Sequence, residues 1–306
     1  MLLKSYAGDF EYAKRLIASF NELNPESIHL YAVVPQADLE LFAGFASDTV
    51  TVLTEERLGQ YLVDHEVAGI RPGYINQEIV KIAFWELGLA ENYFCVDSDA
   101  VFVRPLHRED FMFDATTPYT VLVEDNELKV EPRYYEQHWQ GREPQLRKIQ
   151  QLVGLQDRRV LTCHGHQIFS AKVLKSLKDD FMEPRGWSYE DLLEQAPYEF
   201  TWYNMWLQKA RTIPIEIREP LVKVFHHEEQ ELEYALRGIM KADIARGYVA
   251  LVVNSNYARA WSFPTSEQSV SGALGRYVSY PTLLAALSKK TRGTLRSLLP
   301  ARLRPS

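Results

Sequence analysis

The first hundred residues alternate between short β-prone runs and amphipathic segments, and this alternation constrains the fold more than any other feature. Residues 2–6, 28–34 and 49–53 are apolar, β-prone runs that predict three strands. Between them, residues 10–20 carry apolar side chains at helical spacing, and residues 38–45 predict a shorter helix. A β-α-β-α-β order is typical of a mostly parallel sheet covered by helices.

Two aspartates, Asp97 and Asp99, stand one residue apart after the next apolar run, and another apolar run follows at residues 100–103. Alternate residues of a strand point to the same side, so both carboxylates can aim at a common point. Two hard oxygen ligands at the mouth of a buried strand suit a divalent cation that also holds a phosphate. The pair therefore predicts a metal site, with a structural turn at the strand end as the alternative.

The helix before this pair and the elements after it are also predicted from the sequence. Asn76 is expected to cap a helix that ends before Gly88. Beyond residue 105 the pattern is less regular, with a helix over residues 133–153 broken at Gly141 and Pro144. Strands are expected over residues 213–217 and 221–225, and a charged helix over residues 228–246.

Two histidines follow the last of these predicted strands. His226 or His227 could give the same cation a third, nitrogen ligand, which suits manganese better than magnesium or calcium. The alternative is that one histidine caps the following helix and the other is solvated.

Residues 162–167 carry His164 and His166 around Gly165, which would permit close approach of a ligand to the backbone. Two buried, hydrogen-bonded histidines account for this pattern equally well. Glu199 stands among aromatic residues, as in sugar-binding subsites where rings stack on the sugar and carboxylates take hydroxyls. The alternative for this run is an ordinary aromatic core.

Composition bounds the class of protein. With 306 residues, 46% of them hydrophobic, the chain can build one large domain or one domain with a subdomain. No apolar run is long enough to span a membrane, the first residues turn polar too soon for a signal peptide, and Cys95 and Cys163 offer no disulfide framework. We therefore expect a cytoplasmic protein.

Charge is distributed unevenly along the chain. The formal net charge is −7, yet residues 289–304 carry six lysines and arginines and no acidic residue. An acidic body argues against nucleic-acid binding. The basic tail, with leucines interleaved, could contact an anionic membrane surface at the inner face of the plasma membrane, or form a solvated terminus.

Several motifs are absent from the sequence. The chain has no phosphate-binding P-loop, no Gly-X-Gly-X-X-Gly fingerprint and no Gly-X-Ser-X-Gly elbow. These absences argue against a Walker ATPase, a dinucleotide-dependent dehydrogenase and an α/β-hydrolase.

The segment Asn76-Gln77-Glu78-Ile79-Val80-Lys81, followed by residues 93–105, resembles the glutamine-and-lysine helix and Asp-X-Asp strand of GT-A-type bacterial glycosyltransferases. The likeness is closest to an uncharacterised bacterial glycosyltransferase-like family and spans roughly residues 1–230. The resemblance implies a GT-A-like (Rossmann-like) α/β fold, with a mostly parallel central sheet flanked by helices and a less regular C-terminal acceptor half. The implied domains are a catalytic domain at 1–265, divided into a nucleotide-binding half (1–105) and an acceptor half (106–265), and an extension at 266–306.

The resemblance also implies the reaction. A metal-dependent, hexosyltransferase-like enzyme would move a sugar from a nucleotide-sugar to a saccharide or glycolipid acceptor, in bacterial surface polysaccharide or glycolipid synthesis. Mn²⁺ or Mg²⁺ would stabilise the growing charge of the departing nucleoside diphosphate. Retention and inversion at the anomeric carbon stay open.

Residue roles follow from the same resemblance. Ser5, Tyr6 and Asp9 would hold the base and ribose, and Gln77 and Lys81 the ribose or phosphates. Asp99 would bind the cation directly, Asp97 would bind the ribose or share the cation, and His226 would complete the metal shell. His164, His166 and Glu199 would line the donor-sugar and acceptor side.

An inverting enzyme needs a carboxylate base at the acceptor hydroxyl. Glu199 is the first candidate, with Glu190 and Asp191 in reserve, and Asp97 is the other candidate catalytic residue. In the better-known retaining families this histidine lies in a longer motif that contains glycine and lysine, and such a motif is absent after His226 in this sequence.

Two other functions compete with this reading. Asp97 and Asp99 nearly fit the nucleophile motif of haloacid-dehalogenase-type phosphatases, although that nucleophile usually stands on the first strand of its domain. A non-catalytic protein that binds a nucleotide-sugar is the second rival.

Overall fold

The computed structural model describes residues 1–123, 132–155, 159–163, 165–225, 234 and 237–253. The chain divides into two compact units. The first comprises Met1–Ser98 and Pro105–Leu221, and the second comprises Asp99–Arg104 and the chain from Val222 onward. The domain bounds expected from the sequence stay a prediction, and the basic tail at residues 289–304 lies outside the described residues.

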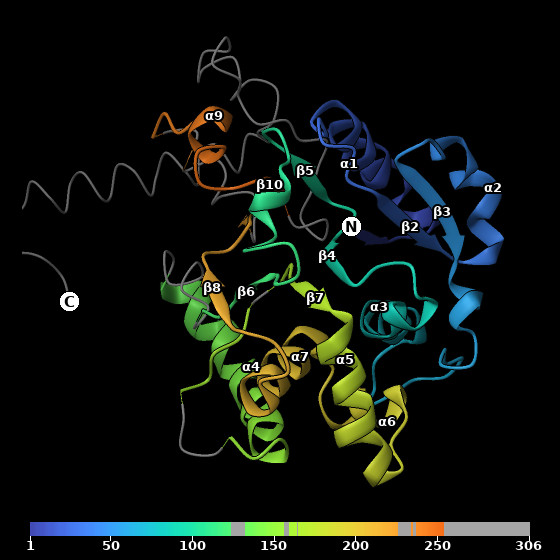
Figure 1. Cartoon of the computed structure of the whole chain (residues 1–306), viewed down its shortest axis with the longest axis vertical. Coiled ribbons are helices and arrows are strands. Elements are labelled where there is room, and N and C mark those ends of the chain that lie inside the picture. The colour runs from blue at the N-terminus through green and yellow to red at the C-terminus, as the bar shows by residue number, and fades with distance from the viewer. Residues whose placement is uncertain (124–131, 156–158, 164, 226–233, 235–236, 254–306) are drawn as a thin grey trace, which may run out of the picture. The chain divides into compact units, whose positions relative to one another are not determined.

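A five-stranded sheet forms the centre of the first unit, in the order β3-β2-β1-β4-β7 (Figure 1). Its strands are β1 (Leu2–Lys4), β2 (Leu30–Val34), β3 (Val50–Thr54), β4 (Asn92–Val96) and β7 (Ile168–Ser170). Strand β1 pairs in parallel with β2 and β4, β2 pairs in parallel with β3, and only β7 runs antiparallel, along β4. The predicted α/β fold with a mostly parallel central sheet flanked by helices is confirmed.

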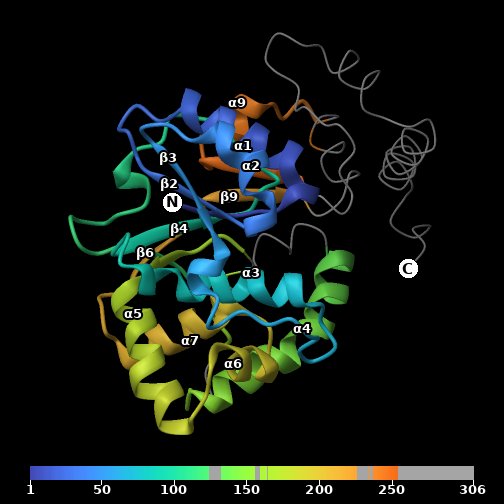
Figure 2. The same ribbon diagram turned by 90° about the vertical axis from the view of Figure 1, so that its right-hand side faces the viewer.

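Helices cover both faces of this sheet (Figure 2). On one face lie α1 (Phe10–Glu22) and α2 (Leu39–Phe42), which meet where the Phe10 and Phe42 rings pack edge to face at 5.3 Å. On the other face lies α3 (Pro72–Ala83), with α4 (Pro132–Leu152), α5 (Ala171–Ser176), α6 (Tyr189–Gln195) and α7 (Glu199–Ala210) beyond it.

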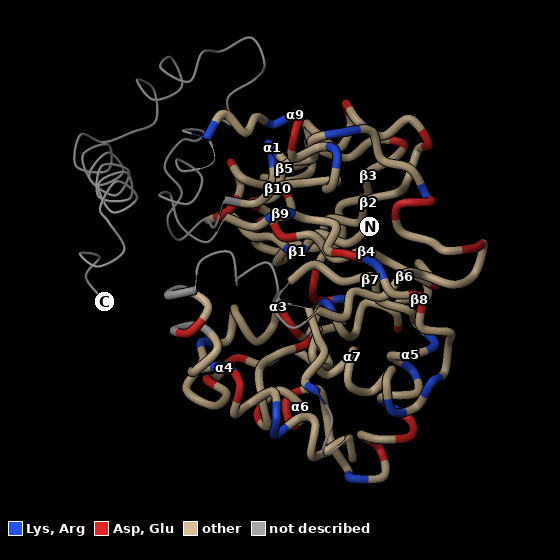
Figure 3. The backbone as a smooth tube through the Cα atoms, turned by 90° about the vertical axis from the view of Figure 1, so that its left-hand side faces the viewer, with Lys and Arg blue, Asp and Glu red and all other residues tan. Residues whose placement is uncertain are grey.

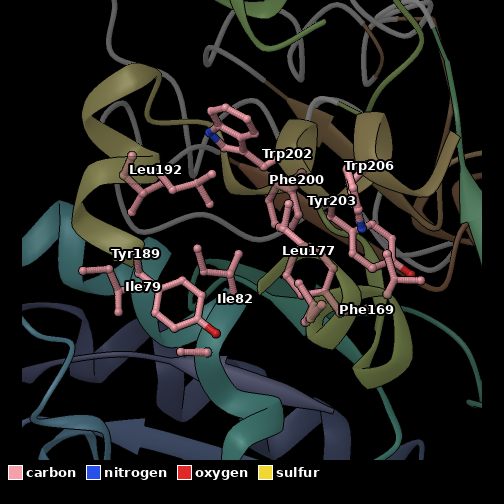
Figure 4. Packing of buried hydrophobic residues seen from close by; sticks show 14 of the residues in the cluster. Ile79, Ile82, Phe169, Leu177, Tyr189, Leu192, Phe200, Trp202, Tyr203 and Trp206 are labelled. Carbon is pink, nitrogen blue, oxygen red and sulfur yellow. The ribbon is translucent and has the colours of Figure 1, made fainter. Parts of the chain in front are cut away.

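The main hydrophobic core lies between α3 and this second set of helices (Figure 4). Ile79 and Ile82 of α3 face aromatic side chains of α7, among them Trp202 and Tyr203, and all four residues are fully buried. Helix α3 is buried on every side from residue 78 to residue 83, so the two charged side chains in that stretch, Glu78 and Lys81, are buried as well.

The start of α3 differs from the prediction. The helix begins at Pro72, four residues before Asn76, because proline fits the first turn, where its missing N–H costs no hydrogen bond. The Asn76 side chain caps nothing and instead exchanges two hydrogen bonds, of 2.8 and 2.9 Å, with the Val63 backbone.

Helix α4 also differs, because it runs unbroken through Gly141 and Pro144. Leu146 and Ile149, just after the proline, are fully buried in the main core. The burial of these side chains outweighs the one hydrogen bond that proline removes.

Two short strands complete the first unit. Strands β6 (Tyr119–Val121) and β8 (Glu216–Arg218) pair in parallel. The strand predicted at residues 213–217 thus begins only at Glu216.

The second unit contains a three-stranded sheet in the order β5-β10-β9. Strand β10 (Ala250–Val253) pairs antiparallel with β5 (Ala100–Phe102) and parallel with β9 (Val222–Phe225), which confirms the strand predicted at residues 221–225. The single helix predicted over residues 228–246 is wrong in its described part: Gly238 has a φ of 75°, and α9 covers only Lys241–Ile244.

The outer helices of the first unit carry both acidic and basic residues (Figure 3). Among the described residues, every helix falls short of the length and apolar character that crossing a membrane requires.

Candidate active site

The carboxyl ends of β1 and β4 meet at one edge of the sheet, because these neighbouring strands are parallel and Leu3 pairs with Val96. The chain leaves β1 toward β2 and β3 on one side, while β4 lies on the other side. Such a switch point is where open α/β sheets bind ligands. The segments that follow these strands are joined directly, since the Ser98 hydroxyl donates to the Asp9 carboxylate at 3.0 Å.

Asp97 stands directly after β4, and both of its carboxylate oxygens face a protein nitrogen. Oδ1 lies 3.0 Å from the Lys81 ammonium, and Oδ2 lies 3.6 Å from Nε2 of His166. Burial works against ionisation, but Lys81, through its charge and its hydrogen bond, and His166 together outweigh burial and lower the pKa of Asp97 to about 2. With this pKa the carboxylate is ionised at pH 7. Its side chain is 35% exposed, so one side is open to a ligand.

Lys81 joins two carboxylates that are far apart in the sequence. Its ammonium lies 3.0 Å from Asp97 and 3.1 Å from Glu199, which begins α7. The Lys81 side chain is only 5% exposed. Burial alone would lower the pKa of Lys81, but Asp97 and Glu199 raise it well above its usual range, so the ammonium stays charged.

Glu78 lies one turn before Lys81 and was missed as a functional candidate. It is 2% exposed, and neither carboxyl oxygen has a hydrogen-bond partner among the described residues. Burial, and then the Glu199 charge, raise the pKa of Glu78 well above its usual range, which favours the neutral acid. A charged pair at i and i+3 inside an otherwise apolar helix was the sequence signal for it.

His166 is brought to Asp97 by the turn that leads into β7. The residue is 5% exposed, and its Nε2 atom has no hydrogen-bond partner among the described residues. Burial lowers the pKa of His166, and Lys81 adds to this, against the opposing effect of Asp97. The imidazole is therefore neutral at pH 7.

The loop after β1 brings together the residues expected to hold a nucleotide. Ser5 is buried, and its hydroxyl has no hydrogen-bond partner among the described residues. The Tyr6 ring is 43% exposed and lies against Gly8, where an added Cβ would meet the ring at 2.4 Å. Asp9 is half-buried, and burial raises its pKa. Its side chain accepts from Ser98 and makes no capping hydrogen bond to α1.

The other predicted site residues are placed as follows. Gln77 is half-buried on α3, and Asp99 is half-buried at the first position of the second unit. Glu190 and Asp191 belong to the first turn of α6, where Asp191 forms a capping box with Ser188 and Glu190 contacts His65 at 2.9 Å. His164 and His226 lie outside the described residues.

Within the part of the chain that the structure describes, no group of three His, Cys, Asp or Glu side chains could hold a metal ion. The donor set that the sequence proposes is nevertheless chemically suited to Mn²⁺ or Mg²⁺, since carboxylate oxygens are the ligands of hard cations. Asp97 offers less to a cation than expected, because the Lys81 ammonium already takes Oδ1.

Comparison with known proteins gives a family and a set of distant structural likenesses. The sequence pattern of a family described as "Family of unknown function (DUF6492)" matches residues 2–259. No curated protein sequence matches the chain.

Three of the similar solved structures are described as glycosyltransferases. Mouse xyloside xylosyltransferase 1 is 10% identical at a TM-score of 0.45, over 84% of this chain and 98% of that one. The bifunctional glycosyltransferase WbbM is 11% identical at 0.45, over 84% of this chain and 45% of that one. The galactosyltransferase LgtC, solved with donor and acceptor sugar analogues, is 11% identical at 0.44, over 92% of this chain and 96% of that one. At these values the similarities carry no argument about function.

Proposed function

We propose that this chain, which belongs to the family of unknown function DUF6492, is a metal-dependent glycosyltransferase that moves a sugar from a nucleotide-sugar to an acceptor. One observation carries the proposal: at the switch point of a parallel sheet, a buried ammonium holds two carboxylates, Asp97 and Glu199. This arrangement would join the proposed nucleotide-binding edge to Glu199 and the aromatic residues of α7.

The donor would bind along the carboxyl edge of β1 and β4. The exposed Tyr6 ring offers a stacking surface for the base, and Ser5 and Asp9 offer polar groups to the ribose. Gln77 and Lys81 would face the ribose or the phosphates, with Lys81 as the fixed positive charge. Asp97, ionised at neutral pH and partly open, would take ribose hydroxyls or share the cation.

The cation would be held first by Asp99, with Asp97 and His226 as further ligands. Mn²⁺ or Mg²⁺ bound there would neutralise charge on the diphosphate as it leaves. Lys81, the buried ammonium on α3, would add a second positive charge close to the same phosphates.

Sugar transfer breaks the bond between the anomeric carbon and the diphosphate oxygen, which leaves with the electron pair. The acceptor oxygen forms the new bond, and its proton goes to a base. In an inverting reaction Glu199 would take that proton, with His164 and His166 lining the sugar. A retaining reaction would not need Glu199 as a base, and its carboxylate would then bind sugar hydroxyls.

Thermal unfolding tests the donor and the cation together. UDP-sugars and GDP-sugars with Mn²⁺ should raise the melting temperature by preferential binding to the folded chain. Asp99→Ala should abolish that shift, while Asp48→Ala, at an exposed position before β3, should keep it. A shift that persists in Asp99→Ala and in EDTA would contradict the metal assignment.

Two further outcomes would redirect the assignment. Nucleotide-sugar binding without turnover on any acceptor would indicate a binding protein. Phosphate release from a generic phosphomonoester, with no effect of nucleotides, would indicate the phosphatase chemistry of an Asp97 nucleophile. In the structure Asp97 follows β4, the fourth strand of the chain, unlike the usual first-strand nucleophile.

We also propose saccharide or glycolipid acceptors of surface polysaccharide synthesis, at the cytoplasmic face of the membrane. The basic tail at residues 289–304 supports this, because clustered lysines and arginines bind anionic lipids. The full chain should sediment with phosphatidylglycerol vesicles at low salt, and replacing the six tail lysines and arginines by glutamine should prevent it. Equal sedimentation of both chains would contradict a role for the tail.

A further inference from the structure

His166 has a backbone conformation that residues other than glycine seldom adopt. Its φ is 56°, in the left-handed region, although the residue is buried and carries a large side chain. Glycine would take this conformation at no steric cost, and Gly165 stands immediately before it. Buried strain of this kind persists only where the surroundings enforce it, and it gathers at functional sites.

The next residue, Gln167, enforces the conformation. Its backbone oxygen accepts from Cys95 N of β4 at 3.0 Å, which fixes the start of β7 against the sheet. Its fully buried side chain exchanges two 3.3 Å hydrogen bonds with the Val121 backbone and donates to Asn204 at 2.7 Å. With Gln167 held from three sides, the turn at His166 has little freedom, so the imidazole is held beside Asp97.

The contact between His166 and Asp97 is incomplete. Nε2 lies 3.6 Å from Oδ2 of Asp97, beyond the range of a direct hydrogen bond, and has no other partner among the described residues. Asp97 does not close the gap, because Lys81 holds its other oxygen at 3.0 Å. An oxygen atom about 2.8 Å from both atoms would satisfy both, and the Asp97 side chain is 35% exposed.

We propose that His166 and Asp97 together bind one hydroxyl of the transferred sugar, with Gln167 as the positioning residue that holds the imidazole in place. The hydroxyl donates to Oδ2 of Asp97 and accepts from Nε2–H of the imidazole. This inference rests on the proposed function, and it makes the His166–Asp97 gap a determinant of which sugar the enzyme accepts. A histidine with only a packing role would more often have its buried nitrogen satisfied and its backbone relaxed.

The test compares His166→Gly with wild type in binding calorimetry, using UDP- and GDP-hexoses and the free UDP and GDP, all with Mn²⁺. Free nucleoside diphosphate should bind His166→Gly within about twofold of wild type, since it lacks the sugar hydroxyl. The intact nucleotide-sugar should bind at least about tenfold more weakly, as expected for a lost hydrogen bond in a pair with a charged group. His166→Asn, which tolerates the left-handed backbone but has a shorter side chain, provides a second variant with the same expected loss.

Arg211→Gly is the matched control, because Arg211 has a φ of 55° at the exposed end of α7. It should leave the affinity for both ligands unchanged. Both glycine variants should keep the melting temperature within about 4 °C of wild type, since each relieves a left-handed backbone.

Deoxy-sugar donors identify the hydroxyl. A donor that lacks the bound hydroxyl should bind wild type more weakly than the intact donor does, and it should bind His166→Gly no more weakly than it binds wild type. A deoxy donor that keeps this hydroxyl should bind His166→Gly more weakly than it binds wild type, in addition to any loss from its own missing group. If wild type binds nucleotide-sugars and His166→Gly binds them equally well, or loses free nucleoside diphosphate to the same extent, this inference is wrong and the proposed function stands. If wild type binds no nucleotide-sugar, the proposed function fails and the inference fails with it.

Discussion

Lys81 decides the charge balance of the candidate site. It is the buried cation between Asp97 and Glu199, and both carboxylates depend on it for compensation. Removing one partner of a buried ion pair leaves an uncompensated charge, which costs more than the pair itself contributes.

Lys81→Met should therefore lower the free energy of unfolding by about 3 kcal/mol, measured by denaturant unfolding at pH 7. Lys209→Met, at an exposed position on α7, is the control and should change stability by less than about 0.5 kcal/mol. Adding Glu199→Gln to Lys81→Met should recover part of the loss, because it removes one unpaired buried charge. A Lys81→Met chain as stable as wild type would contradict this account of the cluster.

Glu78 gives the cluster a pH dependence. Its pKa is higher in the folded chain than in the unfolded chain, where it is about 4.3. The folded chain therefore binds this proton more tightly. The stability that Glu78 contributes is complete below the unfolded pKa and is lost as the pH rises through the folded pKa.

Glu78→Gln keeps the shape of the neutral acid and cannot ionise. The difference in unfolding free energy between Glu78→Gln and wild type should therefore shift in favour of the variant as the pH rises from 4 to 9. Glu194→Gln, at an exposed position on α6, is the control and should show no such trend. A pH-independent difference for Glu78→Gln would mean that Glu78 is ionised in the folded chain.

At the scale of residues, the sequence predicted which side chains belong to the site better than it predicted which of them contact one another. Asp97, Lys81, His166 and Glu199 were each candidates, and the structure brings them together. The Lys81–Glu199 ion pair spans 118 positions, and no local pattern encodes a contact at that separation. Glu78 was missed because a glutamate on a predicted helix is ordinarily solvated, and only tertiary packing shows that α3 is buried on every side.

Among the elements, the loop after β1 makes a sharp demand on one glycine. An added Cβ at Gly8 would lie 2.4 Å from the Tyr6 ring, so the ring would have to move. Because Tyr6 is exposed, the fold tolerates that movement, but the proposed stacking surface for the base is lost.

Gly8→Ala should weaken nucleotide-sugar binding about tenfold, in line with the ~1–3 kcal/mol of a base–aromatic stack, while the melting temperature stays near that of wild type. Gly44→Ala, where an added Cβ meets nothing within 4 Å, is the matched control and should leave affinity unchanged. Calorimetric titration measures both. Unaltered binding by Gly8→Ala would rule out Tyr6 as the base platform.

The elements themselves were largely predictable. The three N-terminal strands, the strand before Asp97, and α1 follow from apolar runs and helical spacing. The errors concern ends and breaks: Pro72 starts α3 where Asn76 was expected to, and α4 continues through Pro144. In both cases tertiary burial or first-turn geometry overrode the local signal.

For the whole molecule, the parallel sheet with its switch point followed from the order of elements, but the partition of the chain did not. Asp97 and Asp99 belong to different compact units, although a single residue separates them. The alternation of side chains along a strand places Asp97 and Asp99 at one strand end. In the structure, however, Asp99 leads into β5, which pairs with β10, about 150 residues further along the chain. Strand pairing at that range leaves no trace in local sequence.

The central claim is that the chain cleaves a nucleotide-sugar, and the most direct measurement is nucleoside diphosphate release from a panel of UDP- and GDP-sugars with Mn²⁺. We predict that at least one donor is slowly hydrolysed without acceptor, that EDTA stops the release, and that Asp99→Ala reduces it by at least about a hundredfold. If no nucleotide-sugar is bound or cleaved with any divalent metal, the glycosyltransferase assignment is wrong.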